Sequence, residues 1–338
     1  MPADGYELTV AKGTGINLLA DGLVEQRLAR SAFPLKVYAR LRPRREIIAG
    51  DYLLVPGDTL ATMLAKLAAG AVQRHTITFA EGLTLNQWRK TLAKKDNIDH
   101  TLAEKSNTEI AASLGIEYEN PEGWFAPDTY VYLSDDSDLT ILRRAHQRME
   151  TMLASLWAER EDGLPYKTPY EALVMASIIE KETGVAEERA QIAGVFVRRL
   201  LKDMRLQTDP TIIYGLGAEF DGNLTRKHLR QLSPYNTYRH GGLPPTPIAN
   251  PGAAALEAAL HPAVGNELFF VAKGDGSHHF SASLNEHNKA VRDFQVDRRE
   301  KNYRSAPTPA LTTPTTEAPT ASAQAPTVTT APTAGEAP

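Results

Sequence analysis

The segment best suited to acid–base chemistry is 175–183, Met-Ala-Ser-Ile-Ile-Glu-Lys-Glu-Thr, which carries Glu180 and Glu182. At about 100° per residue in a helix, Glu180 shares a face with Leu173 and Ala176. Glu182 lies about 200° further round the same helix. We therefore expect Glu180 to be partly buried, which raises the pKa of a carboxyl toward that of a general acid, and Glu182 to stay in solvent. A structural ion pair of Glu180 at the helix end is the open alternative.

Two further segments place polar and aromatic side chains where loops are expected. They are 205–211, Arg-Leu-Gln-Thr-Asp-Pro-Thr, and 233–238, Ser-Pro-Tyr-Asn-Thr-Tyr. Aromatic rings beside amides suit a sugar, whose ring faces stack and whose hydroxyl and N-acetyl groups form hydrogen bonds. An irregular loop of purely structural use is the alternative.

Three histidines near the C-terminal end of the folded part, His278, His279 and His287, are candidates for metal binding. Their carboxylate partner would be Glu286, a weak one, and the chain has no cysteine. Because this set lacks a defined ligand geometry, we expect hydrogen bonding near the site or the hairpin, and we expect neither a metal nor a cofactor.

Periodic patterns predict the elements that hold these residues. A 3.6-residue spacing of apolar side chains predicts helices over Asp138–Leu156, Tyr170–Thr183 and Glu188–Leu201. A helix over Pro251–Leu260 with Asn250 as its cap, a hairpin pairing 268–272 with 278–281, and a last helix from Leu284 to about Arg298 follow.

The first hundred residues contain a weak repeat of a strand, a glycine-containing turn and a helix, with copies that begin at Tyr6, Tyr52 and His75. In the second copy, Gly-Asp-Thr-Leu at 57–60 resembles part of a LysM module, a small βααβ fold that binds glycans. A purely structural α+β module is the alternative.

These patterns together predict an α+β protein with a small LysM-like module over 1–118 and a helix-rich catalytic domain with short strands over 119–304. Residues 305–338 consist almost wholly of Ala, Pro and Thr and lack core-forming side chains. We expect this tail to be disordered.

Composition excludes several classes of function. The 37 basic and 41 acidic residues give a net charge of −4, so binding driven by nucleic-acid phosphates is not expected. The absence of cysteine removes disulfides, thiolate nucleophiles and iron–sulfur clusters. No apolar run reaches the roughly 18 residues of a membrane span, and residues 1–6 do not resemble a signal peptide.

Several long motifs, in order, resemble the endolytic murein transglycosylase (YceG-like) family. Their shared feature is a dense mixture of polar, aromatic and turn-forming residues, and they lie at 122–130, 176–183, 205–211, 235–238, 242–245 and 278–288. The resemblance spans nearly all of residues 1–300. By that resemblance Glu180 matches the catalytic glutamate of the family, and the pair Tyr235-Asn236 is similar to a Tyr-Asn element of other lytic transglycosylases.

The resemblance implies cleavage of the β-1,4 bond between N-acetylmuramic acid and N-acetylglucosamine within a glycan strand, without water. The 6-hydroxyl of the muramic acid closes a 1,6-anhydro ring, so one carboxyl serves first as general acid and then as base. Glu180 has this role by the resemblance. The candidate residues for holding the N-acetyl group and stabilising the oxocarbenium-like state are Gln207, Asp209, Tyr235, Asn236 and Tyr238.

The family normally carries one N-terminal transmembrane anchor at the periplasmic face of the inner membrane, and this sequence departs from it there. The implied partners are peptidoglycan strands and peptidoglycan synthases, with termination of nascent strands as the implied role. Two alternatives stay open. One is a hydrolytic muramidase that uses Glu180 with Asp209 or Glu182, and the other is a non-catalytic peptidoglycan-binding scaffold.

Overall fold

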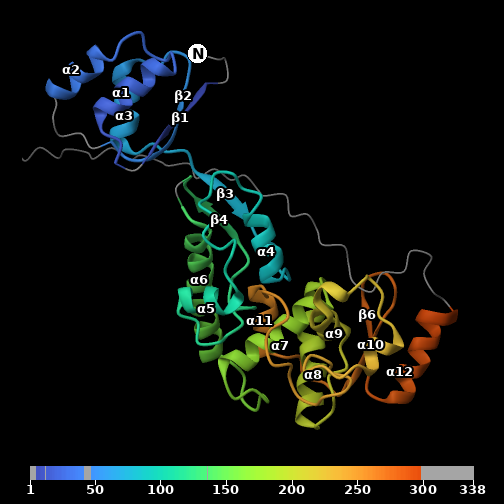
Figure 1. Cartoon of the computed structure of the whole chain (residues 1–338). Helices are drawn as coiled ribbons and strands as arrows, with labels where there is room; N and C mark the ends of the chain where they lie inside the picture. Colours follow the sequence, from blue (N-terminus) through green and yellow to red (C-terminus); the bar gives the residue numbers. More distant parts are fainter. Residues whose placement is uncertain (1–4, 12, 42–46, 135, 298–338) are drawn as a thin grey trace, which may run out of the picture. The chain divides into compact units, whose positions relative to one another are not determined.

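The computed structural model of the chain describes residues 5–11, 13–41, 47–134 and 136–297. It contains helices and three separate two-stranded antiparallel sheets (Figure 1), which confirms the α+β class. The tail predicted to be disordered, 305–338, lies outside these residues.

The first unit has the order βααβ. Its elements are β1 (Tyr6–Val10), α1 (Ile16–Glu25), α2 (Phe33–Leu41) and β2 (Gly50–Leu54). The strands pair from Tyr6↔Leu54 to Val10↔Gly50, and the inward side chains of alternate residues join a core with α3 (Leu60–Ala69). The side chain of Thr59 accepts a hydrogen bond from the Thr62 amide and so begins α3.

The second unit repeats this order with β3 (His75–Thr78), α4 (Leu85–Leu92), α5 (Asn107–Leu114) and β4 (Thr129–Tyr132). β3 pairs with β4 from His75↔Tyr132 to Thr78↔Thr129. Its core is aromatic: Phe79 and Trp88 stack with centroids 3.8 Å apart. This pairing joins segments on either side of residue 118, where the sequence predicts a domain boundary. That boundary stays a prediction.

The Gly-Asp-Thr-Leu segment at 57–60 does not open a βααβ unit. It lies between β2, which already pairs with β1, and α3. In the fully described segment 55–74, α3 is the one helix before β3, and β3 pairs with β4. The resemblance to a LysM module therefore stays an expectation.

The third group of elements is mostly helical. It comprises α6 (Asp138–Ala158), α7 (Pro169–Glu182), the 3-10 turn Ala186–Glu188, α8 (Arg189–Leu201), α9 (Asp209–Leu216), the 3-10 turn Gly217–Glu219, α10 (Arg226–Arg230), α11 (Ala253–Leu260), the hairpin β5 (Phe269–Ala272) and β6 (His278–Ser281), and α12 (Leu284–Val291), which continues as a π-helical segment, Arg292–Asp297. α7 lies against α11, with α6 and α8 also packed on it (Figure 1). All residues from Ala172 to Ile179 are buried, as expected for a helix enclosed on every side.

The predicted helices and hairpin of this part are confirmed within one or two residues at the ends that the structure describes. The cap of α11 is a correction. Its N-cap is Gly252, and no side chain caps it. Asn250 is fully buried, and its side chain instead accepts from the Phe125 amide and donates to the Leu83 carbonyl. The Asn250 side chain therefore bonds backbone groups of two distant segments instead of capping the helix that follows it.

Candidate active site

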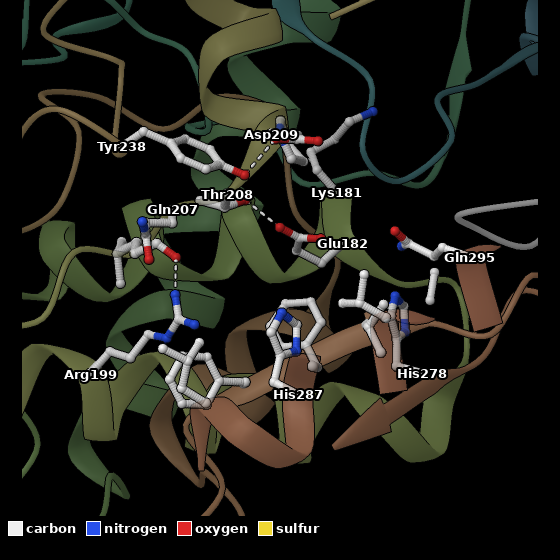
Figure 2. A pocket seen from close by; sticks show the side chains of 18 of the residues that line it. Lys181, Glu182, Arg199, Gln207, Thr208, Asp209, Tyr238, His278, His287 and Gln295 are labelled. Carbon is white, nitrogen blue, oxygen red and sulfur yellow. Dashed lines mark hydrogen bonds between the residues drawn. The ribbon is translucent and has the colours of Figure 1, made fainter. Parts of the chain in front are cut away.

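A pocket of about 730 Å³ opens at the C-terminal end of α7. Elements far apart in the sequence form its walls: the end of α7, the segment before α9, the hairpin β5–β6 and α12 (Figure 2). The polar side chains that line it are Lys181, Glu182, Arg199, Gln207, Thr208, Asp209, Tyr238, His278, His287 and Gln295. Apolar side chains of β5, α12 and the segment 206–213 complete the lining.

Glu182 is the last residue of α7, and its carboxylate lies in this pocket. The Thr208 hydroxyl donates a hydrogen bond to its Oε1 (Figure 2). Burial raises the pKa of Glu182 to about 7, and the nearby Asp209 also raises it. The expectation that Glu182 stays in solvent is therefore wrong. The helical-wheel argument considered α7 alone, whereas the segment before α9 covers the face of α7 that carries Glu182.

Backbone bonds fix the segment 205–208 that covers Glu182. The buried Arg199 donates from Nη1 to the Leu206 carbonyl at 2.7 Å, and the Gln207 amide donates to the Thr237 carbonyl at 3.2 Å. Gln207 has a φ of 52°, a left-handed conformation that is uncommon for a residue with a side chain. Such strain is typical of functional sites, and here it lies directly before Thr208.

Asp209 and Tyr238 form a second polar pair in the same pocket. The Tyr238 hydroxyl donates to Asp209 Oδ1 at 2.8 Å. Burial raises the pKa of Tyr238, and the charge of Asp209 raises it further, so the phenol stays protonated. The structure thus brings Asp209, Tyr238 and Gln207, three of the predicted binding residues, together around Glu182 (Figure 2).

Glu180 lies elsewhere and does not line this pocket. Its Oε2 accepts a hydrogen bond from the Gly252 amide at 3.0 Å, at the N-terminus of α11. Burial raises the pKa of Glu180 as expected, with a further contribution from Glu81. The neighbouring Lys181 donates to the Gly82 carbonyl at 3.1 Å. Glu180 therefore faces the junction of α7, α11 and the turn before α4.

Tyr235 and Asn236 are also outside the pocket lining. The Tyr235 hydroxyl bonds the Thr246 hydroxyl at 2.9 Å. Asn236 is buried, its Nδ2 donates to three backbone carbonyls around α10, and its Oδ1 accepts from the Tyr238 amide at 3.0 Å. Asn236 thereby holds the backbone that places the Tyr238 ring.

Another glutamate, Glu122, lies apart from the pocket. It is 3% exposed, and its Oε1 accepts from the Leu85 amide at 2.9 Å and from Asn250 Nδ2 at 3.2 Å. The Tyr214 hydroxyl approaches Oε2 at 3.4 Å. Burial raises the pKa of Glu122 to about 7.

The histidines separate in the structure. His278 and His287 line the pocket, whereas His279 is exposed on the neighbouring position of β6. Burial lowers the pKa of His287, with further contributions from Arg199 and His279. His278 bonds Glu188, at 2.8 Å between Nδ1 and Oε2. The sequence interpretation missed Arg199 and Thr208, which line the pocket, and Glu188, which bonds His278 from outside the lining. An arginine within the apolar pattern of 192–201 was the available signal for Arg199.

One group of side chains in the described ranges is close enough to share a metal ion. The ligand atoms of Glu7, Asp51 and His75 all lie within 4.8 Å of one another. Glu7 is exposed, and Asp51 already accepts a hydrogen bond from the Ser134 hydroxyl. None of the three lines the Glu182 pocket.

Fold and site define an α+β protein with a half-buried carboxyl in a polar and aromatic pocket. The YceG-like family model matches residues 8–293, and the chain belongs to this family. A Bacillus subtilis protein named endolytic murein transglycosylase is 31% identical over 316 residues, which cover 87% of this chain and 86% of that protein.

Two other comparisons agree with this assignment. A Streptococcus pneumoniae protein with the same name is 24% identical over 83% of this chain, and the match spans 57% of its own length. A crystal structure of a YceG-like protein from Listeria monocytogenes is similar at a TM-score of 0.54 and 28% identity, covering 85% of this chain and 98% of the other.

Proposed function

We propose that this protein is a peptidoglycan lytic transglycosylase that cleaves the bond between N-acetylmuramic acid and N-acetylglucosamine within glycan strands. The observation that carries the proposal is Glu182, a carboxyl with a pKa raised to about 7 inside a polar pocket. The name endolytic murein transglycosylase, carried by relatives over most of the chain, supports the substrate class.

In the proposed reaction Glu182 acts twice. Its protonated carboxyl gives a proton to the glycosidic oxygen as the bond to the muramic acid anomeric carbon breaks. The muramic acid 6-hydroxyl attacks that carbon and returns its proton to the Glu182 carboxylate. A pKa near the working pH suits a group that is acid in one step and base in the next, and the tethered nucleophile supplies the orientation.

The neighbours of Glu182 have matching roles in this proposal. The Thr208 hydroxyl, which donates to Oε1, orients the carboxyl and stabilises its ionised form. Asp209, held by Tyr238, is in this proposal the carboxylate that stabilises positive charge on the sugar ring. Gln207 offers an amide for the N-acetyl group.

Glu180 was the general acid expected from the sequence, and the geometry favours Glu182 instead. All three predicted binding residues in the pocket surround Glu182, whereas Glu180 bonds the backbone of Gly252. We assign Glu180 to the α7–α11 junction. Asn236 holds the backbone of Tyr238 by accepting from its amide, and the Tyr235 hydroxyl bonds the Thr246 hydroxyl outside the pocket.

A hydrolytic muramidase is the second candidate, and one observation favours it. Asp209 lies in the same pocket as Glu182, and hydrolytic glycosidases generally use two carboxylates. Product mass separates the two candidates, because an anhydro end is lighter than a hydrolysed end by one water.

The test is mass spectrometry of purified glycan strands incubated with the full chain. The proposal predicts internal cleavage products with 1,6-anhydro ends. Hydrolysed ends would establish the muramidase, and bound but uncleaved strands would establish a non-catalytic scaffold.

The remaining expectations concern place and partners. We propose that the enzyme acts in the cell envelope, at the periplasmic face of the inner membrane, and ends strands made by peptidoglycan synthases. In the part of the chain that the structure describes, no helix is both long and apolar enough to cross a membrane. Glycan binding by the first hundred residues belongs to the same proposal.

A further inference from the structure

His278 is a buried residue of the pocket wall that the proposed acid–base cycle does not use. It is the first residue of β6, and its side chain is 4% exposed. The register Ala272↔His278 and the bond from the Lys273 amide to the Ser277 carbonyl, 2.9 Å, fix the hairpin at this point. The ring also packs nearly perpendicular to the ring of Phe270, with centroids 5.4 Å apart. The ring is therefore held in one orientation.

Glu188 holds His278 by two bonds. Glu188 Oε1 accepts from the His278 amide at 2.8 Å, and Oε2 accepts from Nδ1 at 2.8 Å. The Thr183 hydroxyl also approaches Oε2, at 3.4 Å. A carboxylate surrounded by donors accepts its bond from an Nδ1–H, so the hydrogen of a neutral imidazole lies on Nδ1 and the lone pair on Nε2.

The two nitrogens face different surroundings. Glu188, which bonds Nδ1, does not line the pocket, whereas His278 does. No residue in the described ranges bonds Nε2, and Nε2 is not among their enclosed polar atoms that lack a partner. Thr183, the C-cap of α7, directly follows Glu182. Hydrogen bonds from Thr183 to Glu188 and between Glu188 and His278 thus connect the end of α7 to the His278 ring.

We propose that His278 is a substrate-binding residue whose Nε2 accepts a hydrogen bond from a hydroxyl of the sugar bound beside Glu182, with Glu188 as the positioning residue that sets its tautomer. This inference rests on the proposed function. The ligand chemistry is a pyranose hydroxyl, because an unprotonated imidazole nitrogen accepts a hydrogen bond and a hydroxyl donates one. Glu188 acts as carboxylates generally do when they fix a histidine tautomer.

Two substitutions separate the nitrogens of His278. Asparagine places an amide near the position of Nδ1 and can still donate to Glu188, but it lacks any group at Nε2. Glutamine reaches the position of Nε2 but loses the Nδ1 bond. His279→Asn, on the exposed neighbour, is the matched control.

The experiment compares the full-length parent, His278→Asn, His278→Gln and His279→Asn in strand cleavage and in thermal unfolding. We expect His278→Asn to keep the melting temperature near that of the parent but to lose at least about tenfold in cleavage, the scale of one hydrogen bond. His278→Gln should melt lower yet keep more cleavage per folded molecule. His279→Asn should match the parent.

A purely structural His278 gives the opposite order, with His278→Asn as active as the parent, and that result overturns the inference. Glu188→Gln adds an independent check, since a glutamine that donates to Nδ1 moves the hydrogen to Nε2 and should lower cleavage as His278→Asn does. Failure of the proposed function gives a different result, because the parent would then release hydrolysed sugar ends or no ends.

If the parent releases hydrolysed ends, the relative cleavage by His278→Asn and His278→Gln still tests the inference. If the parent releases no ends, binding of a soluble murein fragment replaces cleavage as the test. Weaker binding by His278→Asn then supports the contact, and unchanged binding overturns it.

Discussion

Glu122 is buried and Glu182 is half-buried, yet burial raises the pKa of both to about 7. Their surroundings are opposite. Glu122 has its Oε1 bonded to the Leu85 amide and to Asn250, and it lines none of the pocket around Glu182. Glu182 is bonded by one side-chain hydroxyl, that of Thr208, and faces a pocket of about 730 Å³.

The difference shows that a shifted pKa does not by itself identify a catalytic acid. Burial produces the shift at both sites, but a general acid must also reach the proton acceptor of its substrate. Glu122 bonds the loops around α4 and α11 and does not line the pocket. Glu182 combines the same pKa with access.

The largest expected effect separates these two carboxyls directly. Glu182→Gln keeps the shape of the side chain but has no proton to give, so strand cleavage should fall by about 10² to 10⁴. Glu122→Gln resembles the protonated acid and should stay within a few-fold of the parent. Initial rates of strand cleavage measure both. Equal losses would show that burial, rather than access, decides the role.

Substitution of Glu122 should affect the free energy of unfolding more than it affects cleavage. Glu122→Ala leaves the Leu85 amide and the Asn250 side chain without their acceptor, which costs about 1–3 kcal/mol in the free energy of unfolding. Glu122→Gln should cost much less because it keeps an acceptor oxygen. Chemical denaturation measures both, and a Glu122→Ala variant as stable as the parent would contradict the structural role.

The pH dependence of stability follows from the sign of the same shift. The ordinary pKa of a glutamate is 4.5, and burial raises the pKa of Glu122 to about 7 in the fold. The folded state therefore binds this proton more tightly than the unfolded state. The contribution of Glu122 to the free energy of unfolding is fully present below about pH 4.5 and is lost as the pH rises through about 7. Glu122→Gln should flatten this decline in denaturation curves between pH 4 and 8. An unchanged slope would assign it to another group.

Activity should show a basic limb set by Glu182. The first step needs its protonated carboxyl, so kcat/KM should fall about tenfold per pH unit well above pH 7. Measurements from pH 5 to 9 check this. A constant kcat/KM up to pH 9 would exclude Glu182 as the proton donor.

The smallest effect is expected at Tyr238. Tyr238→Phe keeps the ring but removes the hydroxyl that donates to Asp209, so cleavage should fall by no more than about tenfold. A loss as large as that of Glu182→Gln would indicate that Tyr238 itself handles protons.

Sequence patterns predicted the elements well but the site only in part. The helices were predictable because α7, α8 and α11 are largely apolar runs rich in residues with high helix propensity. The motifs at 205–211 and 235–238 contribute Gln207, Asp209 and Tyr238 to the pocket lining. The choice between Glu180 and Glu182 depended on which face of α7 the segment before α9 covers. No helical wheel contains that information, and the same holds for Asn250, whose partners lie more than a hundred residues away.

The two glutamates at the end of α7 are separated most directly by the mass of the sugar ends that Glu180→Gln and Glu182→Gln release from intact glycan strands. Glu180 bonds a backbone amide outside the pocket, so Glu180→Gln should release 1,6-anhydro ends at a rate within a few-fold of the parent. Glu182→Gln should bind strands and release almost none. Abundant anhydro ends from Glu182→Gln, together with an inactive but folded Glu180→Gln, would contradict the assignment of Glu182 as acid and base.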